Sequence, residues 1–407
     1  MSKIIFINRY FYPDHSATSQ LLSDLAFVLA RQGQNVEVIS SAQLYDDAKA
    51  NLSRRDDING VTVRRVRTTS YGRGNLVGRA MDYLTFYVSS TILMLRTVNA
   101  DDLLVAETDP PLISLFAMMV AKVRRAKLFN WVQDIFPEVA TALGVRGLQP
   151  VVVRGIVWFR DLSWRAASCN VVLGRRMEEY LKQHGVKDRQ IQVIHNWSSG
   201  TSVWPVKSEN NVLRAEWGLA DKFVVGYSGN LGRAHDYETM IDAATLMENN
   251  DNVRFLYIGG GAHRESVERE VEKRGLRNVL FKPYQSRDRL AESLSVADLH
   301  VISLLPDLEG YIVPSKFYGI LAVGRPTLYV GDPEGEIPLI LDKWLCGTTV
   351  KIGDSESFAE YVTMLVADQN KCEKAGQRAR ELFTKYFDKK LAISKWVGVI
   401  ESQQLLH

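Results

Sequence analysis

The sequence predicts an α/β protein with two domains, each built around a parallel sheet. Short, apolar, β-rich runs alternate with longer amphipathic segments along 407 residues, and this alternation is typical of strands joined by crossover helices. A chain of this length is too long for one hydrophobic core. The polar stretch at residues 196–211 contains Gly, Pro and Ser and interrupts the alternation. We therefore predict a linker there, between an N-terminal domain at residues 1–200 and a C-terminal domain at residues 207–387.

The chain opens with a predicted strand at residues 3–8 and a helix at residues 19–32 that ends at Gly33. With the next strand these segments form a βαβ unit, which predicts a parallel sheet. The loop between them contains His15 and Ser16 and lacks the pattern G-x-G-x-x-G, which argues against a dinucleotide cofactor. Further strands of this half are predicted at residues 35–40, 61–66, 103–107, 128–132, 170–173 and 191–195, and further helices at 76–98, 112–123, 151–167 and 174–184.

The second half repeats the alternation of strands and helices. Its predicted strands are residues 223–227, 253–258, 279–282, 299–305 and 327–330, and its predicted helices are 237–248, 262–274, 290–297, 317–323, 358–367, 377–387 and 391–406. Three of these strands run into loops that suit a phosphate group, at residues 229–236, 259–261 and 309–316. One such loop in each of three strand–helix units predicts a site for a phosphorylated ligand.

The residue types in these loops fit that ligand. Glycines let the backbone approach it closely, and a helix start offers free N–H groups and the positive end of the helix dipole. Arg233, His235 and Lys316 add cationic groups, Ser315 adds a capping hydroxyl, and Glu309 adds an acceptor for sugar hydroxyls. For the last loop, a capped helix with a surface lysine is the alternative, purely structural explanation.

Basic residues concentrate in the first half of the chain. Residues 1–200 hold 25 Lys and Arg against 18 Asp and Glu, whereas residues 201–407 hold 25 against 29, within a net charge of +3. The predicted helices at 76–98, 112–123 and 151–167 mix aromatic, aliphatic and basic side chains. This pattern favours an anionic partner such as a membrane surface. Helices packed on the sheet, with arginines at their rim, are the alternative.

The sequence predicts neither secretion nor a membrane span. The first residues have the pattern of a strand rather than a signal peptide, and no apolar run reaches the ~18–20 residues that a span needs. Cys169, Cys346 and Cys372 lie far apart, which favours a reducing compartment and no disulfide framework. No Asp-x-Asp pair stands in a loop that would hold a divalent metal. We expect a cytoplasmic protein with no metal, no cofactor and no nucleic-acid partner.

Motifs in both halves resemble the retaining glycosyltransferases of family 4, which have the two-domain GT-B fold. The resemblance covers nearly the whole chain and is most specific in Pro-Ser-Lys followed by Ala-x-Gly-Arg-Pro at residues 314–326. It also rests on residues 10–13, 34–39, 133–138 (QDIFPE), 229–236 (GNLGRAHD) and 259–261. The sequence is similar to the branch that builds bacterial exopolysaccharide, colanic-acid-like and O-antigen repeat units.

This resemblance implies two Rossmann-like domains facing each other across a cleft, with a helix at about residues 388–407 packed back on the first. It implies a hexosyltransferase that uses a nucleotide-sugar, a UDP-sugar ahead of a GDP-sugar, and a polyprenyl-diphosphate-linked acceptor. Such an enzyme would be peripheral on the cytoplasmic face of the inner membrane. The implied catalytic residues are Asp134, Glu309 and Lys316; the implied donor-binding residues are Gly229, Asn230, Arg233, His235, Gly259, Gly260, Tyr284, Ser315 and Lys316; the implied acceptor-side residues are His15, Ser16, Gln133 and Asp134.

The chain departs from the commoner family pattern in three places. Many members carry a second glutamate eight residues after the first, where this chain has Phe317 after Glu309. Many have Arg and Lys where Asn230 and His235 stand, and His where Gln133 stands. Another GT-B enzyme, such as an inverting transferase or a nucleotide-sugar epimerase, therefore remains an alternative. A non-catalytic nucleotide-sugar-binding partner is a second alternative.

Overall fold

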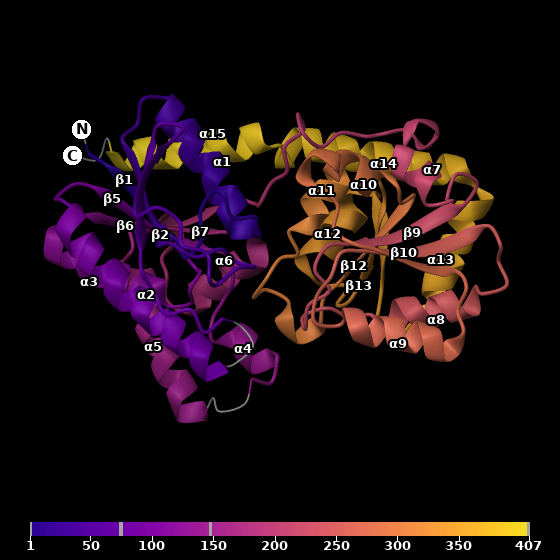
Figure 1. The fold of residues 1–407 in the computed structure, drawn as a ribbon, viewed down its shortest axis with the longest axis horizontal. Helices are drawn as coiled ribbons and strands as arrows, with labels where there is room; N and C mark the ends of the chain where they lie inside the picture. The colour runs from indigo at the N-terminus through magenta and orange to yellow at the C-terminus, as the bar shows by residue number, and fades with distance from the viewer. Residues whose placement is uncertain (1, 73–75, 146–148, 405–407) are drawn as a thin grey trace. The chain divides into compact units, whose positions relative to one another are not determined.

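A computed structural model describes residues 2–72, 76–145 and 149–404. The chain forms two compact units (Figure 1). The first comprises the chain up to His195 together with the segment from Ile393 onward, and the second comprises Asn196–Ala392. Each unit is built on one largely or wholly parallel sheet with helices on both faces, which confirms the predicted fold class.

The sheet of the first unit has eight strands in the order β3-β4-β2-β1-β5-β6-β7-β8. They are β1 (Ile4–Ile7), β2 (Val36–Ser41), β3 (Arg55–Ile58), β4 (Val61–Val66), β5 (Leu103–Glu107), β6 (Lys127–Val132), β7 (Cys169–Val172) and β8 (Ile191–Val193). All neighbours pair in parallel except β3, which is antiparallel to β4. Strand β3 was not predicted, because its residues, Arg-Asp-Asp-Ile, lack the apolar pattern of a buried strand.

Helices cover both faces of this sheet (Figure 1). They are α1 (Ala17–Arg31), α2 (Leu76–Thr97), α3 (Ile113–Arg124), α4 (Glu138–Ala142), α5 (Pro150–Ala166), α6 (Arg175–Gln183) and the C-terminal α15 (Lys389–Gln404). On one face, α2 and α3 bury residues such as Phe86 and Val120 against the strands. Trp396 of α15 is fully buried and packs on Trp131 of β6, with 4.7 Å between the ring centroids. Most of the C-terminal helix is therefore part of the first unit.

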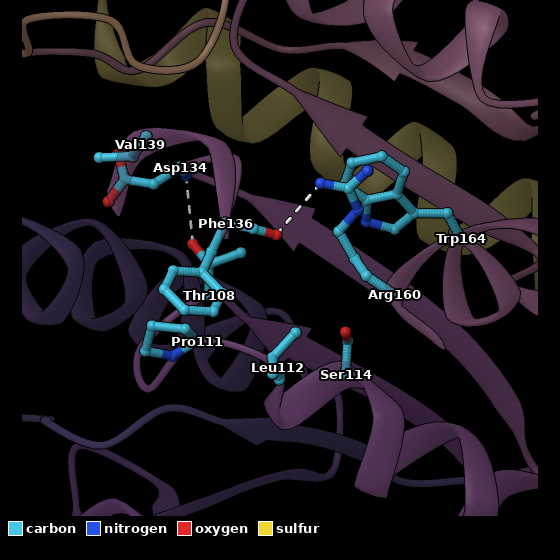
Figure 2. A pocket seen from close by; sticks show the side chains of 9 residues that line it. All are labelled: Thr108, Pro111, Leu112, Ser114, Asp134, Phe136, Val139, Arg160 and Trp164. Carbon is cyan, nitrogen blue, oxygen red and sulfur yellow. Dashed lines mark hydrogen bonds between the residues drawn. The ribbon is translucent and has the colours of Figure 1, made fainter. Parts of the chain in front are cut away.

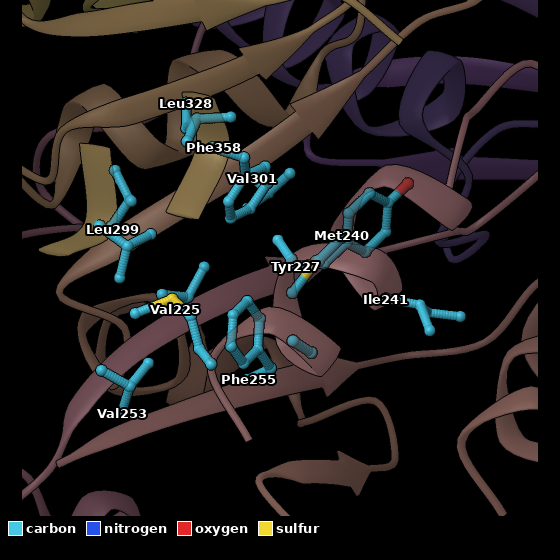
Figure 3. Close-up of a cluster of buried hydrophobic side chains, with 14 of the residues drawn as sticks. Val225, Tyr227, Met240, Ile241, Val253, Phe255, Leu299, Val301, Leu328 and Phe358 are labelled. Atoms are coloured by element: carbon cyan, nitrogen blue, oxygen red, sulfur yellow. The ribbon is translucent and has the colours of Figure 1, made fainter. Parts of the chain in front are cut away.

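The sheet of the second unit has six parallel strands in the order β11-β10-β9-β12-β13-β14. They are β9 (Phe223–Ser228), β10 (Val253–Ile258), β11 (Val279–Lys282), β12 (Leu299–Ser303), β13 (Thr327–Val330) and β14 (Gly347–Val350). The helices are α7 (Val212–Glu216), α8 (Glu238–Leu246), α9 (Arg264–Arg274), α10 (Leu290–Ser295), α11 (Lys316–Ala322), α12 (Glu336–Trp344), α13 (Ser355–Ala367) and α14 (Gln369–Leu382). Figure 3 shows the core in which Val225 and Phe255 of the sheet meet Met240 of α8 and Phe358 of α13. Helix α12 was not predicted because Pro338 interrupts the helical pattern in its first turn, and β14 was not predicted because its residues, Gly-Thr-Thr-Val, form no apolar run.

Both sheets have a point at which the strand order reverses. In the first unit this point lies between β1 and β5, and in the second unit it lies between β9 and β12. Ligands of open α/β sheets bind outside the carboxyl ends of the strands at such a point. The topology therefore selects the loops after these four strands as the places to look for function. Among the described residues, no helix is long and apolar enough to cross a membrane.

Candidate functional site

The loops after β9 and β12 meet at the reversal point of the second unit. The backbone N–H of Leu305 donates to the carbonyl of Ala234 over 2.9 Å, and the ring Nδ1 of His235 lies 2.5 Å from the carbonyl oxygen of Ser303. The Ser303 hydroxyl in turn donates to the Asp236 carbonyl. These bonds join two predicted donor-binding loops into one structure, although 67 residues separate Asp236 from Ser303 in the chain.

The third loop, after β10, packs against the first through glycines. Gly259 has a φ of +123°, and a Cβ atom there would lie 2.4 Å from the carbonyl oxygen of Gly229. The Gly229 N–H donates to the Ile258 carbonyl over 2.9 Å. The Tyr284 ring lies over the same backbone, 3.0 Å from a Cβ built on Gly259 and 3.3 Å from one built on Gly260. The glycines bring two strand ends together and leave an exposed tyrosine ring at their edge, while the close approach of this backbone to a ligand stays a prediction.

Lys316 is the cation of this group. Its ammonium donates to the Tyr227 hydroxyl and lies 3.9 Å from the Tyr227 ring centroid, and it reaches the Asn230 carbonyl at 3.5 Å. Burial lowers the pKa of Lys316 to about 7. No carboxylate is paired with this ammonium among the described salt bridges. A phosphate arriving here would favour the charged form and gain a mobile cation.

His235 does not supply the positive charge that the sequence suggested. Burial, with the neighbouring Lys316 charge as the second cause, lowers the pKa of His235 to about 3. The ring is therefore neutral near pH 7. Its Nδ1–H donates to the Ser303 carbonyl, so its observed role is to hold the two loops together. A largely buried imidazole beside an ammonium releases its proton, so a neutral His235 is favoured in the absence of a ligand, and its contact with a donor stays a prediction.

Two other predicted donor-binding residues have less contact with this group. Arg233 is exposed in the loop after β9. Ser315 is also exposed and occupies the N-cap position of α11, but its backbone is helical and its side chain accepts no capping hydrogen bond. The predicted capping hydroxyl is therefore wrong. An extended N-cap backbone is what normally aims the serine oxygen at the N–H groups of the first turn.

Glu309 has protein partners of its own. One carboxylate oxygen accepts a hydrogen bond from the Tyr329 hydroxyl, and the other accepts one from the Glu336 N–H at 3.4 Å, at the start of α12. Burial is the main cause that raises the pKa of Glu309. The carboxylate thus stabilises a helix N-terminus, whether or not it also meets a sugar. Its contact with a donor sugar remains a prediction.

In the first unit, Asp134 follows β6 at the wall of a pocket (Figure 2). The pocket has a volume of about 130 Å³. It is lined by Thr108, Pro111, Leu112, Ser114, Asp134, Phe136, Val139, Arg160 and Trp164. The Thr108 hydroxyl accepts hydrogen bonds from the N–H groups of Gln133, at 3.1 Å, and Asp134, at 3.3 Å. Two predicted acceptor-side residues are therefore held against the loop after β5.

The buried guanidinium of Arg160 supports the loop at one wall of this pocket. Arg160 of α5 donates to the Phe136 carbonyl over 3.1 Å, as Figure 2 shows, and bonds to the carboxylates of Glu138 and Asp161. Desolvation, with the Asp109 charge adding to it, raises the pKa of Asp134 to about 6. The contacts of Arg160 thus support the loop that carries Asp134, which is itself an exposed residue.

His15 and Ser16 lie after β1, at the same edge of the sheet as Asp134 but two strands away. Ser16 is the N-cap residue of α1, and its hydroxyl has no hydrogen-bond partner. His15 is exposed, and its carbonyl accepts from the Gln20 side chain. The four predicted acceptor-side residues thus lie in two loops at the same edge of the sheet, one after β1 and one after β6.

Sequence reasoning missed Glu107 and Arg9, two charged residues at the reversal point of the first sheet. Glu107 ends β5 and is 2% exposed, and neither of its carboxyl oxygens has a hydrogen-bond partner. Arg9 follows β1 and is 5% exposed, with its Nε unpartnered. A charged residue at the end of an apolar strand is the signal that could have identified both. Within the described residues, no group of three or more His, Cys, Asp or Glu side chains is arranged to hold a metal ion.

Comparison with known proteins agrees with this geometry. Residues 210–382 match the family described as glycosyl transferases group 1, and residues 18–197 match the glycosyl transferase 4-like domain. The chain is 30% identical over 287 residues to a probable glycosyltransferase, WbjE, of Pseudomonas aeruginosa, covering 67% of this chain and 69% of that protein. The chain belongs to this glycosyltransferase family.

Other relatives of the glycosyltransferase extend the match. This chain is 25% identical over 346 residues to WcaI of Escherichia coli, described as a putative colanic acid biosynthesis glycosyl transferase. The match covers 82% of this chain and 84% of WcaI. The solved structure of Anabaena HepE in complex with UDP and glucose superposes with a TM-score of 0.74 and 16% identity, covering 99% of this chain and 100% of that one. At that identity the likeness shows the GT-B fold alone.

Proposed function

We propose that this glycosyltransferase moves a hexose, with retention of configuration, from a UDP-sugar to a polyprenyl-diphosphate-linked glycan. A GDP-sugar is the second choice of donor. The observation that carries the proposal is the meeting of three strand-end loops around Lys316 at the reversal point of the second sheet. An ammonium without a carboxylate partner among the described salt bridges, beside partly exposed glycine backbone, suits a diphosphate leaving group.

The proposed roles divide between the two units. Lys316 would neutralise the departing diphosphate, Glu309 would meet the donor sugar, and Asp134 would bind the acceptor hydroxyl. A cation can stabilise the leaving group without a divalent metal, so we propose metal-independent transfer. The names of WcaI and of the HepE complex support colanic-acid-like polysaccharide synthesis and a UDP-linked donor.

An acceptor of this class stays anchored in a bilayer. We therefore propose that the enzyme works at the cytoplasmic face of the inner membrane and binds it peripherally. The three cysteines are buried and unpaired, which fits a reducing compartment.

The test combines binding and turnover. Purified protein is screened for thermal stabilisation by UDP, GDP, dTDP and ADP, because a ligand of the native state raises the melting temperature. Transfer from the selected nucleotide-sugar to a short-chain polyprenyl-diphosphate glycan is then followed by NMR, which gives the anomeric configuration. Retention, full activity in EDTA and a loss of at least ~100-fold in Lys316→Ala are expected. An inverted product, or activity that EDTA removes and manganese restores, would contradict the proposal.

A further inference from the structure

Three neighbouring helices of the first unit expose apolar side chains in regular stripes. On α2 the stripe follows helical spacing through Val77, Met81, Leu84, Val88 and Ile92, which are 41–71% exposed. α3 contacts both α2 and α5, so the three helices that carry these side chains are neighbours. The stripe of α3 is Met119 and Val123, and that of α5 is Val151, Val152, Trp158 and Phe159. We call these eleven side chains the apolar face.

The core of the unit does not need the apolar face. The opposite sides of the same helices already supply the core, through residues such as Phe86 and Met94 of α2 and Ile113 and Ala117 of α3. Trp158 and Phe159 are more than half exposed and pack edge-to-face on each other, with 4.8 Å between ring centroids. Contiguous exposed apolar area of this kind marks an interaction surface rather than scattered surface residues.

The charges beside the apolar face have one sign. On the described parts of α2, α3 and α5, both acidic residues, Asp82 and Asp161, are buried. Every charged side chain that is not buried there is basic: Arg79, Arg96, Lys122, Arg124, Arg154 and Arg165. Arg154 follows Val151 by three residues and Arg96 follows Ile92 by four, so these cations continue the stripes.

We propose that the apolar face docks the enzyme on an anionic lipid bilayer. The apolar and aromatic side chains would enter the boundary between head groups and acyl chains, and the arginines and lysine would meet the lipid phosphates. A second copy of this chain fits less well, because two such faces would bring like charges together. The proposal rests on the proposed lipid-linked acceptor for its purpose. Docking itself requires neither donor nor acceptor.

The same helices connect this surface with the pocket beside Asp134. Leu112 and Ser114, at the start of α3, and Arg160 and Trp164 of α5 line that pocket. An acceptor held in the bilayer under α3 and α5 would therefore have its head group on the side of the molecule where the acceptor pocket is built. This arrangement gives the docking face a role in catalysis without a direct contact with the reacting atoms.

Vesicle flotation tests the proposal on the full-length protein. Vesicles of phosphatidylcholine alone are compared with vesicles containing 30% phosphatidylglycerol, at low salt and in 0.5 M NaCl. We expect flotation with the anionic vesicles that falls at least tenfold in high salt or without phosphatidylglycerol. Flotation with the anionic vesicles should fall tenfold or more in Trp158→Ser with Phe159→Ser. It should fall about fivefold per charge or more in Lys122→Glu with Arg154→Glu.

The matched control is Leu246→Ser with Lys374→Glu, which changes an exposed apolar residue and an exposed lysine of the second unit. It should float like the wild type. If the double aromatic variant fails to fold, Leu84→Ser with Val88→Ser tests the same face on α2. Failure of the wild type to float, or equal flotation of the face variants and the control, would overturn the proposal. If the wild type is a dimer and the face variants are monomers, the apolar face binds a second copy of the chain and the lipid proposal is overturned. If the protein captures a protein partner and binds no lipid, the apolar face binds that partner and the lipid proposal is likewise overturned.

Nucleotide binding separates this proposal from the proposed function. The thermal shift produced by UDP does not depend on α2, α3 or α5, so it should be unchanged in every face variant. Normal UDP binding without flotation would contradict the proposal that the apolar face binds lipid, and would leave the transferase proposal intact. Flotation without any transfer product would support the docking face and contradict the proposed transferase function.

Discussion

The ammonium of Lys316 lies 3.9 Å from the ring centroid of Tyr227 and donates to its hydroxyl. Tyr227 is the next-to-last residue of β9, at the reversal point of the second sheet, and is 2% exposed, so the lysine contacts a buried ring. A cation over an aromatic face keeps favourable contacts without a carboxylate that would compete with a phosphate. This pairing holds the Lys316 amino group at the predicted donor site, where a bound phosphate would favour its charged form.

The first prediction concerns the pH dependence of nucleotide binding. Burial lowers the pKa of Lys316 to about 7, so the free protein gains a full charge here only when the pH falls below that value. A bound diphosphate favours the charged form, and binding above pH 7 therefore takes up a proton. The affinity for UDP should fall as the pH rises from 7 to 9, by up to about tenfold per pH unit.

Isothermal titration calorimetry in buffers of different ionisation enthalpy measures this proton uptake directly. In Lys316→Met the affinity should be lower and its dependence on pH between 7 and 9 should disappear. Lys374→Met, at an exposed position of α14, is the control and should keep the wild-type profile. An unchanged profile in Lys316→Met would show that another group takes up the proton.

The second prediction concerns the glycine contact. Gly259→Ala would place a Cβ 2.4 Å from the Gly229 carbonyl oxygen at a φ of +123°, which L-residues rarely adopt. We expect a stability loss of about 1–3 kcal/mol and at least tenfold weaker UDP binding, because the two loops must move apart. Gly398→Ala in α15 has open space around its Cβ and should be neutral or slightly stabilising. Melting curves with and without UDP give both quantities, and wild-type values for Gly259→Ala would contradict the argument.

The third prediction concerns the unpartnered carboxyl group of Glu107. Burial, reinforced by the charges of Asp109 and Asp134, holds the pKa of Glu107 well above its usual range. A raised acid pKa means that its contribution to stability is fully present below pH ~4.5 and is lost as the pH rises through the folded-state pKa. Glu107→Gln removes the ionisation, so the variant should be more stable than the wild type at pH 8, by about 1–3 kcal/mol, and nearly equal to it at pH 4.5.

Chemical unfolding of both proteins at the two pH values checks this. A Glu107→Gln variant that is less stable than the wild type at pH 8 would mean that the carboxylate has a favourable partner in solution. Equal transfer activity would in addition separate Glu107 from the reacting groups.

The fourth prediction concerns the return of the C-terminal helix. Trp396 is fully buried against Trp131, so Trp396→Ala should lower the free energy of unfolding of the first unit by about 3–5 kcal/mol. Trp204→Ala, at a 48% exposed position of the second unit, should change stability by no more than about 0.5 kcal/mol. Hydrogen exchange resolved by segment reports each unit separately. Equal protection of the first unit in the wild type and Trp396→Ala would contradict a stabilising role for the tryptophan pair.

The two α/β units and the loops at the carboxyl ends of their strands could be predicted from local sequence patterns alone. Apolar runs such as Ile4–Ile7 were correctly predicted as strands because a strand buried on both faces must be apolar throughout. The motif around Lys316 was recognisable because glycines and a lysine at a strand end are a local signal. Strand β3 and helix α12 were not predicted, because a polar strand and a helix with proline in its first turn lack the local patterns of these elements and are stabilised by neighbouring segments.

The protonation and the hydrogen-bond partners of those residues could be read from the tertiary structure alone. It made His235 neutral, gave Glu309 a partner at the start of α12, and left Ser315 without a capping bond. It also revealed Glu107 as a buried carboxyl group without a partner. Burial and the distance between charges set protonation and hydrogen bonding, and both depend on residues far apart in the chain. Local pattern fixes which segments form strands and helices, whereas long-range packing fixes the chemistry of the side chains at their ends.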